Sequence, residues 1–286
     1  MSMDSASAGL AIDLHTHSNR SDGSLTPAEL IERAAAAGID VLALTDHDTI
    51  AGLDEARQAA EKRGVRLVSG VEISASWHAQ GIHVLGLWID PGSRLLRERL
   101  DSQAERRRIR MRSMCARLSK LGLPGAELLA AVEAAPGLPT RAHLAEALFA
   151  GGHVSRPDDA FRKYLGKGKA AHMAADWPAL GDVVDWIREA GGIASLAHPA
   201  RYGLSATARR KLLADFVAAG GGALEVVTGA NGAQHVDASA MLAVKFGLSG
   251  SVGSDFHGPH QIWNPLGRSL KLPDCVVPVW RERITT

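Results

Sequence analysis

Seven short strings rich in histidine and carboxylate residues mark this chain, and most of them directly follow a short apolar run. The strings are DLHTHS, SDGSLTP, TDHD, GVEIS, GIHVLG, LAHPAR and GSDFHG. Side chains that follow the strands of a barrel converge at one face of it, and histidine and carboxylate groups gathered there predict a multinuclear metal centre. The nine candidate ligands are His15, His17, Asp22, His47, Glu72, His83, His198, Asp255 and His257.

The spacing within the strings supports shared ligation. His15 and His17 are two residues apart, as are Asp255 and His257, and side chains at positions i and i+2 of a strand share a face. His47 follows an apolar run, where ionisable groups are costly to bury without a partner. Any one of these residues could instead be a capping residue or a satisfied core histidine, so the prediction depends on the whole set.

Strand and helix patterns alternate over two stretches of the chain. In the first stretch, Thr26, Pro27 and Glu29 form a helix start, with a capping box and proline at the first helical position. The alternation returns from Trp177 onward. Repeated strand–helix units imply parallel strands, and about seven of them predict an α/β fold, a distorted (β/α)7 barrel.

The stretch between these halves is expected to be a helical insertion over the C-terminal face of the barrel. The predicted division is residues 1–92 for the first part of the barrel, 93–176 for the insertion and 177–286 for the second part. Loops at this face build the site of a barrel enzyme. Four residues are therefore candidates for substrate binding: Arg141, His143, Lys169 and Arg201. The run Arg106–Arg112 is instead expected to be a solvated face, paired with acidic residues at helical spacing.

Composition narrows the functional classes. The 32 basic and 31 acidic residues give a net charge of +1, so there is no global attraction to nucleic acid or membrane. The two cysteines, Cys115 and Cys275, are far apart, which argues against a zinc–thiolate site and suits a reducing compartment. No signal peptide or membrane-spanning stretch is seen. We therefore expect a cytoplasmic protein, with no membrane or protein partner implied.

Together the strings resemble the PHP (polymerase and histidinol phosphatase) family over about residues 10–90 and 180–260. The resemblance implies a seven-stranded barrel with a trinuclear centre at the C-terminal ends of its strands. The implied ligand sets are His15, His17, Glu72 and Asp255 for one ion, Glu72, His83 and His198 for the second, and Asp22, His47 and His257 for the third. Mixed imidazole and carboxylate ligands suit two or three divalent ions, with Mn preferred and Fe or Zn as alternatives.

The resemblance also implies hydrolysis of phosphate esters. His198, His257 and Asp22 are candidates for helping the leaving group gain a proton, and the sequence does not choose among them. Asp46 and Asp48 are expected to orient the ligands.

Two strings in the insertion, RAHLAEAL and AFRKYLGKG, are similar to stand-alone members of the family that remove the 3′-phosphate of nucleoside 3′,5′-bisphosphates and trim short RNA from its 5′ end. Ala142 departs from that branch, in which proline is expected. The expected substrate is a nucleotide such as pAp, converted to AMP, with short RNA as a second substrate. Alternatives are a phosphatase on another small ester such as histidinol phosphate, an amidohydrolase, and a non-catalytic metal-binding module.

Overall fold

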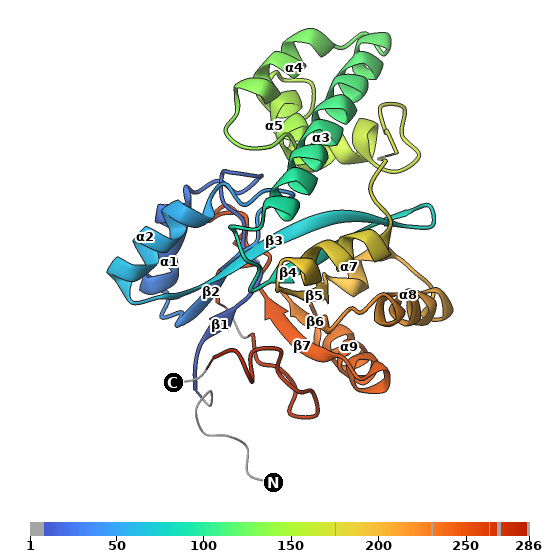
Figure 1. Cartoon of the computed structure of the whole chain (residues 1–286). Helices are drawn as coiled ribbons and strands as arrows, with labels where there is room; N and C mark the ends of the chain where they lie inside the picture. The colour runs from blue at the N-terminus through green and yellow to red at the C-terminus, as the bar shows by residue number, and fades with distance from the viewer. Residues whose placement is uncertain (1–8, 175, 230, 263, 268–269, 285–286) are drawn as a thin grey trace.

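The computed structural model describes residues 9–284, except 175, 230, 263, 268 and 269. The first eight residues, on which the signal-peptide prediction partly rests, and the last two lie outside the described part. Seven strands follow one another in sequence order around a nearly closed barrel (Figure 1). They are β1 (Ile12–Asp13), β2 (Val41–Leu44), β3 (Arg66–Trp77), β4 (Gln80–Leu87), β5 (Ile193–Leu196), β6 (Ala223–Thr228) and β7 (Ser249–Gly253). The amide of Leu14 donates to Val252 O at 2.9 Å and joins the first strand to the last. The predicted seven-stranded α/β barrel is confirmed.

One strand reverses the expected direction. Strands β1, β2 and β3 pair in parallel, as do β5, β6 and β7, but β4 is antiparallel to both β3 and β5. The expectation of parallel strands is therefore wrong at β4. The physical reason is that only His78 and Ala79 separate β3 from β4, and a connection this short can join only antiparallel strands.

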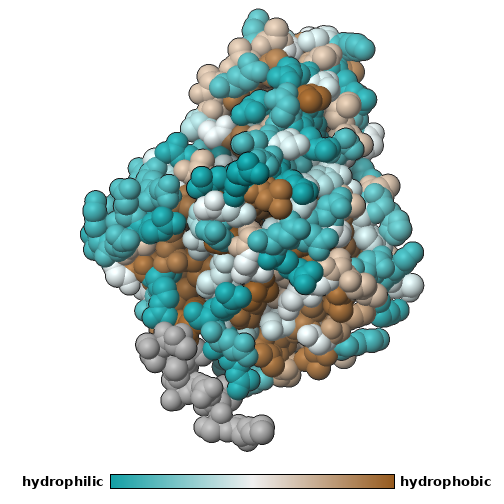
Figure 2. Space-filling view, in the orientation of Figure 1, coloured by the Kyte–Doolittle hydropathy of each residue, from teal (hydrophilic) through white to brown (hydrophobic). Residues whose placement is uncertain are grey.

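Five helices cover the outside of the barrel. They are α1 (Pro27–Ala36), α2 (Leu53–Arg63), α7 (Leu180–Glu189), α8 (Ala206–Ala218) and α9 (Ala233–Phe246). The predicted capping box begins α1, since Thr26 Oγ1 accepts from Glu29 N at 3.2 Å and Glu29 Oε2 accepts from Thr26 N at 2.8 Å. Apolar residues such as Leu42, Ile73 and Phe216 are fully buried beneath these helices, while hydrophilic residues cover the outer face of α1 and α2 (Figure 2).

A second group of helices projects from one end of the barrel (Figure 1). We call it the cap, and it consists of α3 (Arg94–Lys120), α4 (Gly125–Ala134), α5 (Arg141–Ala150), α6 (Pro157–Ala160) and a π-helical turn, η1 (Phe161–Leu165). The cap has its own apolar core, which includes Met114, Leu118, Leu144 and Leu148. No helix in the described part of the chain is long and apolar enough to cross a membrane.

Candidate metal centre

The nine candidate ligands converge at the end of the barrel that faces the cap. The inner ligands are in close contact: His15 Nε2 and His17 Nε2 lie 3.1 Å apart, and each is 3.3 Å from Glu72 Oε2 and 3.2 Å from Asp255 Oδ1. His83 Nδ1 lies 2.8 Å from the other oxygen of Glu72. The structure thus brings side chains from six different strands or strand ends into one cluster of six histidines and three carboxylates.

Ligand atoms within 4.8 Å of one another form three groups in the described part of the chain. They are His17, Asp22, His47 and His257; His15, His17, Glu72 and Asp255; and His47, Glu72 and His83. The four-residue group around Asp255 matches one of the sets that the resemblance implies. The other two differ from the implied sets, because His17 and His47 each belong to two groups. His198 is placed next to the third group, with its Nε2 3.0 Å from Glu72 Oε1.

Several of these atoms have unused bonding capacity. Asp22 Oδ1, His47 Nδ1 and Glu72 Oε2 are buried and have no hydrogen-bond partner within the described part of the chain. Buried polar atoms nearly always have a partner, so lone pairs that converge without donors fit bound cations. Imidazole and carboxylate donors in these numbers suit divalent ions. The cluster is therefore a centre for divalent metal ions.

The electrostatics of the cluster keep its carboxylates ionised. Burial alone would raise the pKa of Glu72, but the imidazoles of His47 and His83 hold that pKa well below its ordinary value. The pKa values of Asp22 and Asp255 are likewise raised by burial but lowered more strongly by the histidines around them. Burial lowers the pKa of His47 to about 4, so its ring is neutral and has a lone pair to donate. Burial alone would lower the pKa of His17, but its hydrogen bonds to Asp255 and Glu72 raise it to about 10, so metal binding at this ring would release a proton.

Glu225 orients two of the ligands and was not predicted from the sequence. Its Oε1 accepts from His15 Nδ1 at 2.8 Å, and its Oε2 accepts from the backbone amide of His198 at 2.6 Å. The side chain is fully buried on β6. A single carboxylate inside the apolar run ALEVVT is the signal that would have indicated this role, because a buried charge needs partners.

Two aspartates brace the loops that carry the ligands. Asp46 accepts from Ser18 N at 2.7 Å and from Ser21 Oγ at 2.7 Å, which ties the loop after β1 to the loop after β2. Asp13 accepts from Ser254 N at 2.8 Å and from Gly267 N at 3.2 Å, which ties the first strand to the last ligand loop. The placement of Asp46 agrees with its expected orienting role, whereas Asp13 was not predicted.

The sequence comparisons agree with this geometry. The PHP domain profile matches residues 13–106. A 5′-3′ exoribonuclease of Haemophilus influenzae is 46% identical over 94% of this chain and 98% of its own length. The chain belongs to the PHP family. A 3′,5′-nucleoside bisphosphate phosphatase of Chromobacterium violaceum is 42% identical over 95% of each chain. A solved PHP-like structure from the same species, described as an amidohydrolase with bound sulfate, has a TM-score of 0.89 at 42% identity over 95% of each chain.

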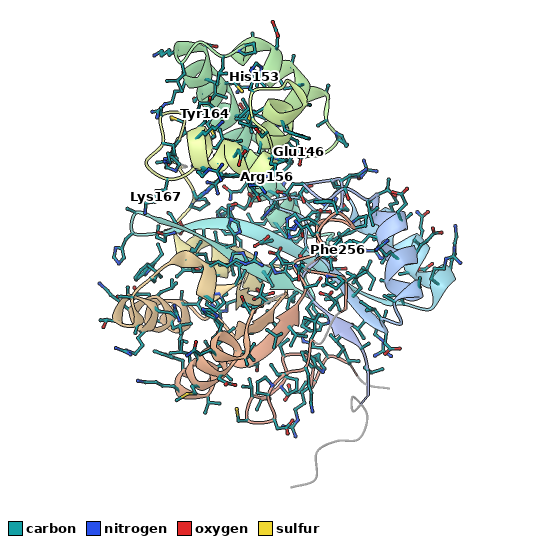
Figure 3. The ribbon with its side chains drawn as sticks, turned by 180° about the vertical axis from the view of Figure 1, so that it is seen from behind. Glu146, His153, Arg156, Tyr164, Lys167 and Phe256 are labelled. Atoms are coloured by element: carbon teal, nitrogen blue, oxygen red, sulfur yellow. The ribbon has the colours of Figure 1, made fainter. Side chains whose placement is uncertain are left out.

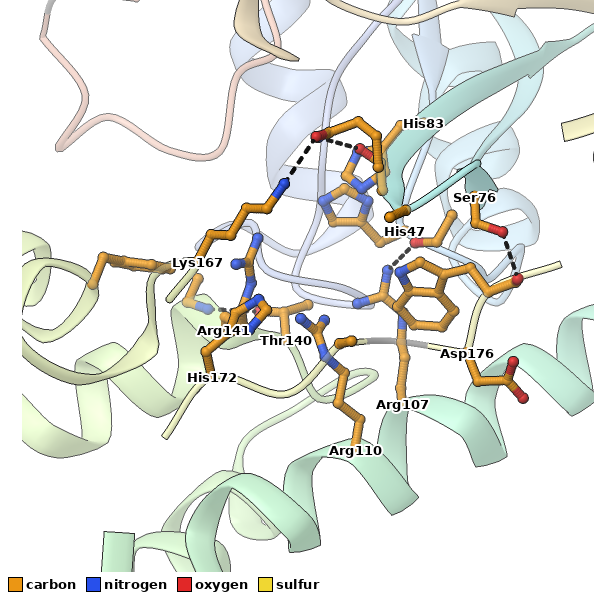
Figure 4. Close-up of a pocket in the computed structure, with 18 of the residues that line it drawn as sticks. His47, Ser76, His83, Arg107, Arg110, Thr140, Arg141, Lys167, His172 and Asp176 are labelled. Atoms are coloured by element: carbon orange, nitrogen blue, oxygen red, sulfur yellow. Dashed lines mark hydrogen bonds between the residues drawn. The ribbon is translucent and has the colours of Figure 1, made fainter. Parts of the chain in front are cut away.

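A cavity of about 570 Å³ separates the PHP metal centre from the cap (Figure 4). Its barrel wall includes Asp22, His47 and His83. Its cap wall is cationic and includes Arg107, Arg110, Thr140 and Arg141. At one edge, Lys167 Nζ donates to Gln80 Oε1 at 3.4 Å, where the cap faces the β3–β4 hairpin (Figure 3).

Two arginines of this wall have no acidic partner among the residues that the structure describes. Arg110 donates to Met173 O at 3.1 Å and lies over the Trp177 ring at 5.8 Å, and Arg141 lies over the Phe161 ring at 5.8 Å. Burial, together with the charges of Arg141 and Arg107, lowers the pKa of Arg110 to about 9. Positive charges gathered on one wall of a cavity attract anions.

Only one of the four predicted substrate-binding residues lines the cavity. Arg141 lines the cavity, whereas His143, Lys169 and Arg201 are not part of its wall. His143 Nδ1 accepts from Thr140 N at 3.1 Å, and the ring also lies against the backbone of Ser21. Arg201 forms an ion pair with Asp255.

The expectation of a solvated arginine face is wrong for two members of the Arg106–Arg112 run. Arg107 is only 7% exposed, and both Arg107 and Arg110 line the cavity. These two residues lie one turn apart on the face of α3 that turns toward the barrel. That burial depends on how α3 docks, which helical spacing alone does not reveal.

Proposed function

We propose that this PHP enzyme removes the 3′-phosphate from nucleoside 3′,5′-bisphosphates, converting pAp to AMP, and that it also hydrolyses short RNA from the 5′ end. One observation carries the proposal. One cavity has a divalent-metal centre at one wall and, at the other, Arg110 and Arg141, which have no acidic partner among the described residues. The names of the relatives from Haemophilus influenzae and Chromobacterium violaceum support the same substrate class.

The dimensions and charge of the cavity support a small substrate with two anionic groups. A volume of about 570 Å³ lies within the usual range for small-molecule sites, which is on the order of 300–1,000 Å³. A guanidinium binds phosphate through two parallel hydrogen bonds. We place the scissile phosphate at the metal centre and the second phosphate at Arg110 and Arg141, with the ribose between them.

The reaction joins a water oxygen to phosphorus, breaks the bond between phosphorus and the 3′ oxygen, and returns a proton to that oxygen. When bound, divalent ions would activate the water and offset the negative charge that develops on the phosphoryl group. Residues of the chain fix the substrate: Arg110 and Arg141 hold the second phosphate so that the scissile one stays at the centre. His198, His257 and Asp22 are the candidates for the proton transfer, since each belongs to or adjoins the cluster.

We propose manganese as the metal, with iron and zinc as alternatives, because mixed imidazole and carboxylate ligands accept all three. We also propose that the enzyme acts in the cytoplasm. Cys115 and Cys275 are both free, and Cys275 is exposed, which suits a reducing compartment.

The test is phosphate release by chelator-stripped protein, with and without Mn²⁺, from pAp, 3′-AMP, 5′-AMP and histidinol phosphate. We expect rapid, Mn-dependent release from pAp with 5′-AMP as the product. Release from histidinol phosphate but not from pAp would retain the phosphatase chemistry and refute the bisphosphate substrate. Failure to release phosphate from any ester, with the metal bound, would refute the proposed reaction.

A further inference from the structure

The cap makes direct contact with the residue that follows the ligand His47. Asp48 Oδ2 accepts from Arg107 Nε of α3 at 2.7 Å, and Asp48 Oδ1 accepts from Gln103 Nε2 at 3.2 Å and from Ser74 N at 2.8 Å. Asp48 is 1% exposed and Arg107 7%. Asp48 also has a φ of 51°, a left-handed conformation that a non-glycine residue keeps only when its surroundings enforce it. The Arg107 ion pair therefore helps to fix the backbone next to His47.

The cap also holds the loop that carries Asp22. Leu138 N donates to Arg20 O at 3.0 Å. Gly137 packs so closely against this loop that a Cβ there would lie 2.5 Å from Asn19 O, so this approach requires glycine. The ring of His143 lies against the backbone of Ser21, the residue before Asp22. These contacts come from the α4–α5 connection and from α5, independently of α3.

The two loops held by the cap are also joined to each other. Asp46, the residue before His47, accepts from Ser18 N, from Ser18 Oγ at 2.6 Å and from Ser21 Oγ. Residues 18–22 and 45–48 therefore form one braced unit beneath the cap. A displacement of the cap would be transmitted to Asp22 and His47 together.

The inner ligands are held differently. His15 is oriented by Glu225 at 2.8 Å, and the loop with Asp255 is tied to β1 through Asp13 and Ser254. In the described part of the chain, Glu225, Asp13 and Ser254 all belong to the barrel, so these contacts do not involve the cap. We name the group of His17, Asp22, His47 and His257 the cap-side site, and the group of His15, His17, Glu72 and Asp255 the inner site.

We infer that the cap is a structural part of the cap-side site: docking of the cap and metal binding at that site are thermodynamically coupled, and Arg107 and His143 are the positioning residues that couple them. Linkage requires the effect to be reciprocal. A docked cap strengthens metal binding at the cap-side site, and metal binding there holds the cap in place. The inference goes beyond the proposed function and does not depend on the substrate, because it concerns the protein and its metal alone.

The first test measures metal content without substrate. Wild-type protein, Arg107→Met and His143→Ala are loaded with Mn²⁺, passed through a desalting column and analysed by elemental mass spectrometry together with protein concentration. Both variants are expected to lose the ion of the cap-side site and to keep the others. Arg108→Met is the matched control on α3, since Arg108 is half-exposed and lies 3.7 Å from Glu105, and it should retain the wild-type metal content.

The second test uses wild-type protein, so it remains informative if Arg107→Met fails to fold. Hydrogen exchange is compared between chelator-stripped and Mn-loaded protein. Metal should increase protection in residues 137–143 of the cap as well as in the ligand loops, on the order of 5- to 150-fold if the coupling has the usual size. Full metal content in both folded variants, equal loss from all sites, or no response of residues 137–143 to Mn²⁺ would each overturn the inference.

Discussion

Glu225 Oε1 lies 2.8 Å from His15 Nδ1, and both side chains are fully buried. A carboxylate in this position holds the proton on Nδ1 and leaves the lone pair of Nε2 directed at the metal centre. Glu225→Gln should therefore lower metal affinity and turnover by about 10- to 100-fold, the usual effect of losing such a partner. Competition with a chelating dye would measure the affinity. Unchanged Mn²⁺ binding would contradict the orienting role.

Tyr202 links the strands that carry His83 and His198. Its hydroxyl accepts from His83 N at 2.9 Å and donates to Ala197 O at 2.8 Å. Tyr202→Phe leaves both backbone groups without this partner, which should destabilise the protein by about 1–3 kcal/mol. Urea unfolding measures the loss. Tyr164→Phe in the cap is the control and should have a smaller effect.

The cationic cap wall of the cavity leads to a prediction about substrate preference. Arg141→Ala removes one charged contact to the second phosphate, which is worth about 1.5–3 kcal/mol. The value of kcat/KM for pAp should fall by roughly 10- to 100-fold, whereas that for 3′-AMP, which has no 5′-phosphate, should change little. Arg112→Ala, on the exposed side of α3 where Arg112 pairs with Glu105 at 2.8 Å, is the matched control. An equal loss with both substrates would show that Arg141 does not select the second phosphate.

The low pKa of Arg110 predicts a pH effect on binding. Below about pH 9 the side chain is protonated in the free enzyme, and above that value the cavity loses a positive charge. The KM for pAp should therefore increase as the pH rises through this range, while kcat changes less, because a bound phosphate keeps the guanidinium protonated. Arg110→Ala should remove this dependence of KM on pH. A wild-type KM that stays constant to pH 10 would refute the assignment.

Metal removal should destabilise the fold. The carboxylates of Asp22, Glu72 and Asp255 all belong to the candidate metal-binding groups, and bound cations would offset their charge. An ion present at 100 times its dissociation constant stabilises the folded state by about 2.7 kcal/mol. Thermal unfolding with EDTA should therefore occur at a lower temperature than unfolding with excess Mn²⁺. Glu225→Gln should show a smaller difference between these two conditions than wild-type protein does.

Much of the barrel could be predicted because the patterns that indicate its strands, helices and helix caps each lie within a short stretch of sequence. The helix start predicted at Thr26, Pro27 and Glu29 is the start of α1, and the alternation predicted from Trp177 onward is present from α7 to β7. The ligand strings could be recognised for the same reason, since every ligand except Asp22 lies in a strand or within four residues of the end of one. Their convergence then follows from the topology of a barrel.

The parts that could not be predicted depend on contacts between distant segments. Arg107 and Arg110 belong to a run of arginines on one helix, and nothing in that run separates them from Arg108 or Arg112 until α3 packs against the barrel. The same applies to His143, which was expected to bind substrate and lies instead between Thr140 and Ser21. The direction of β4 depends on the two-residue turn at His78 and Ala79, which can join only antiparallel strands.

The antiparallel strand β4 limits which insertions and deletions the chain can accept without losing a metal ligand. His83 lies within β4 and pairs with Ser74 across the hairpin, so its position is set by strand register, whereas most other ligands lie on loops. Inserting or deleting one residue in the turn at His78 and Ala79 would shift this register and turn His83 to the opposite face of the sheet. A change of length in a surface loop elsewhere on the barrel leaves the register of β3 and β4 intact. A change of length in this turn would instead move a metal ligand out of the site.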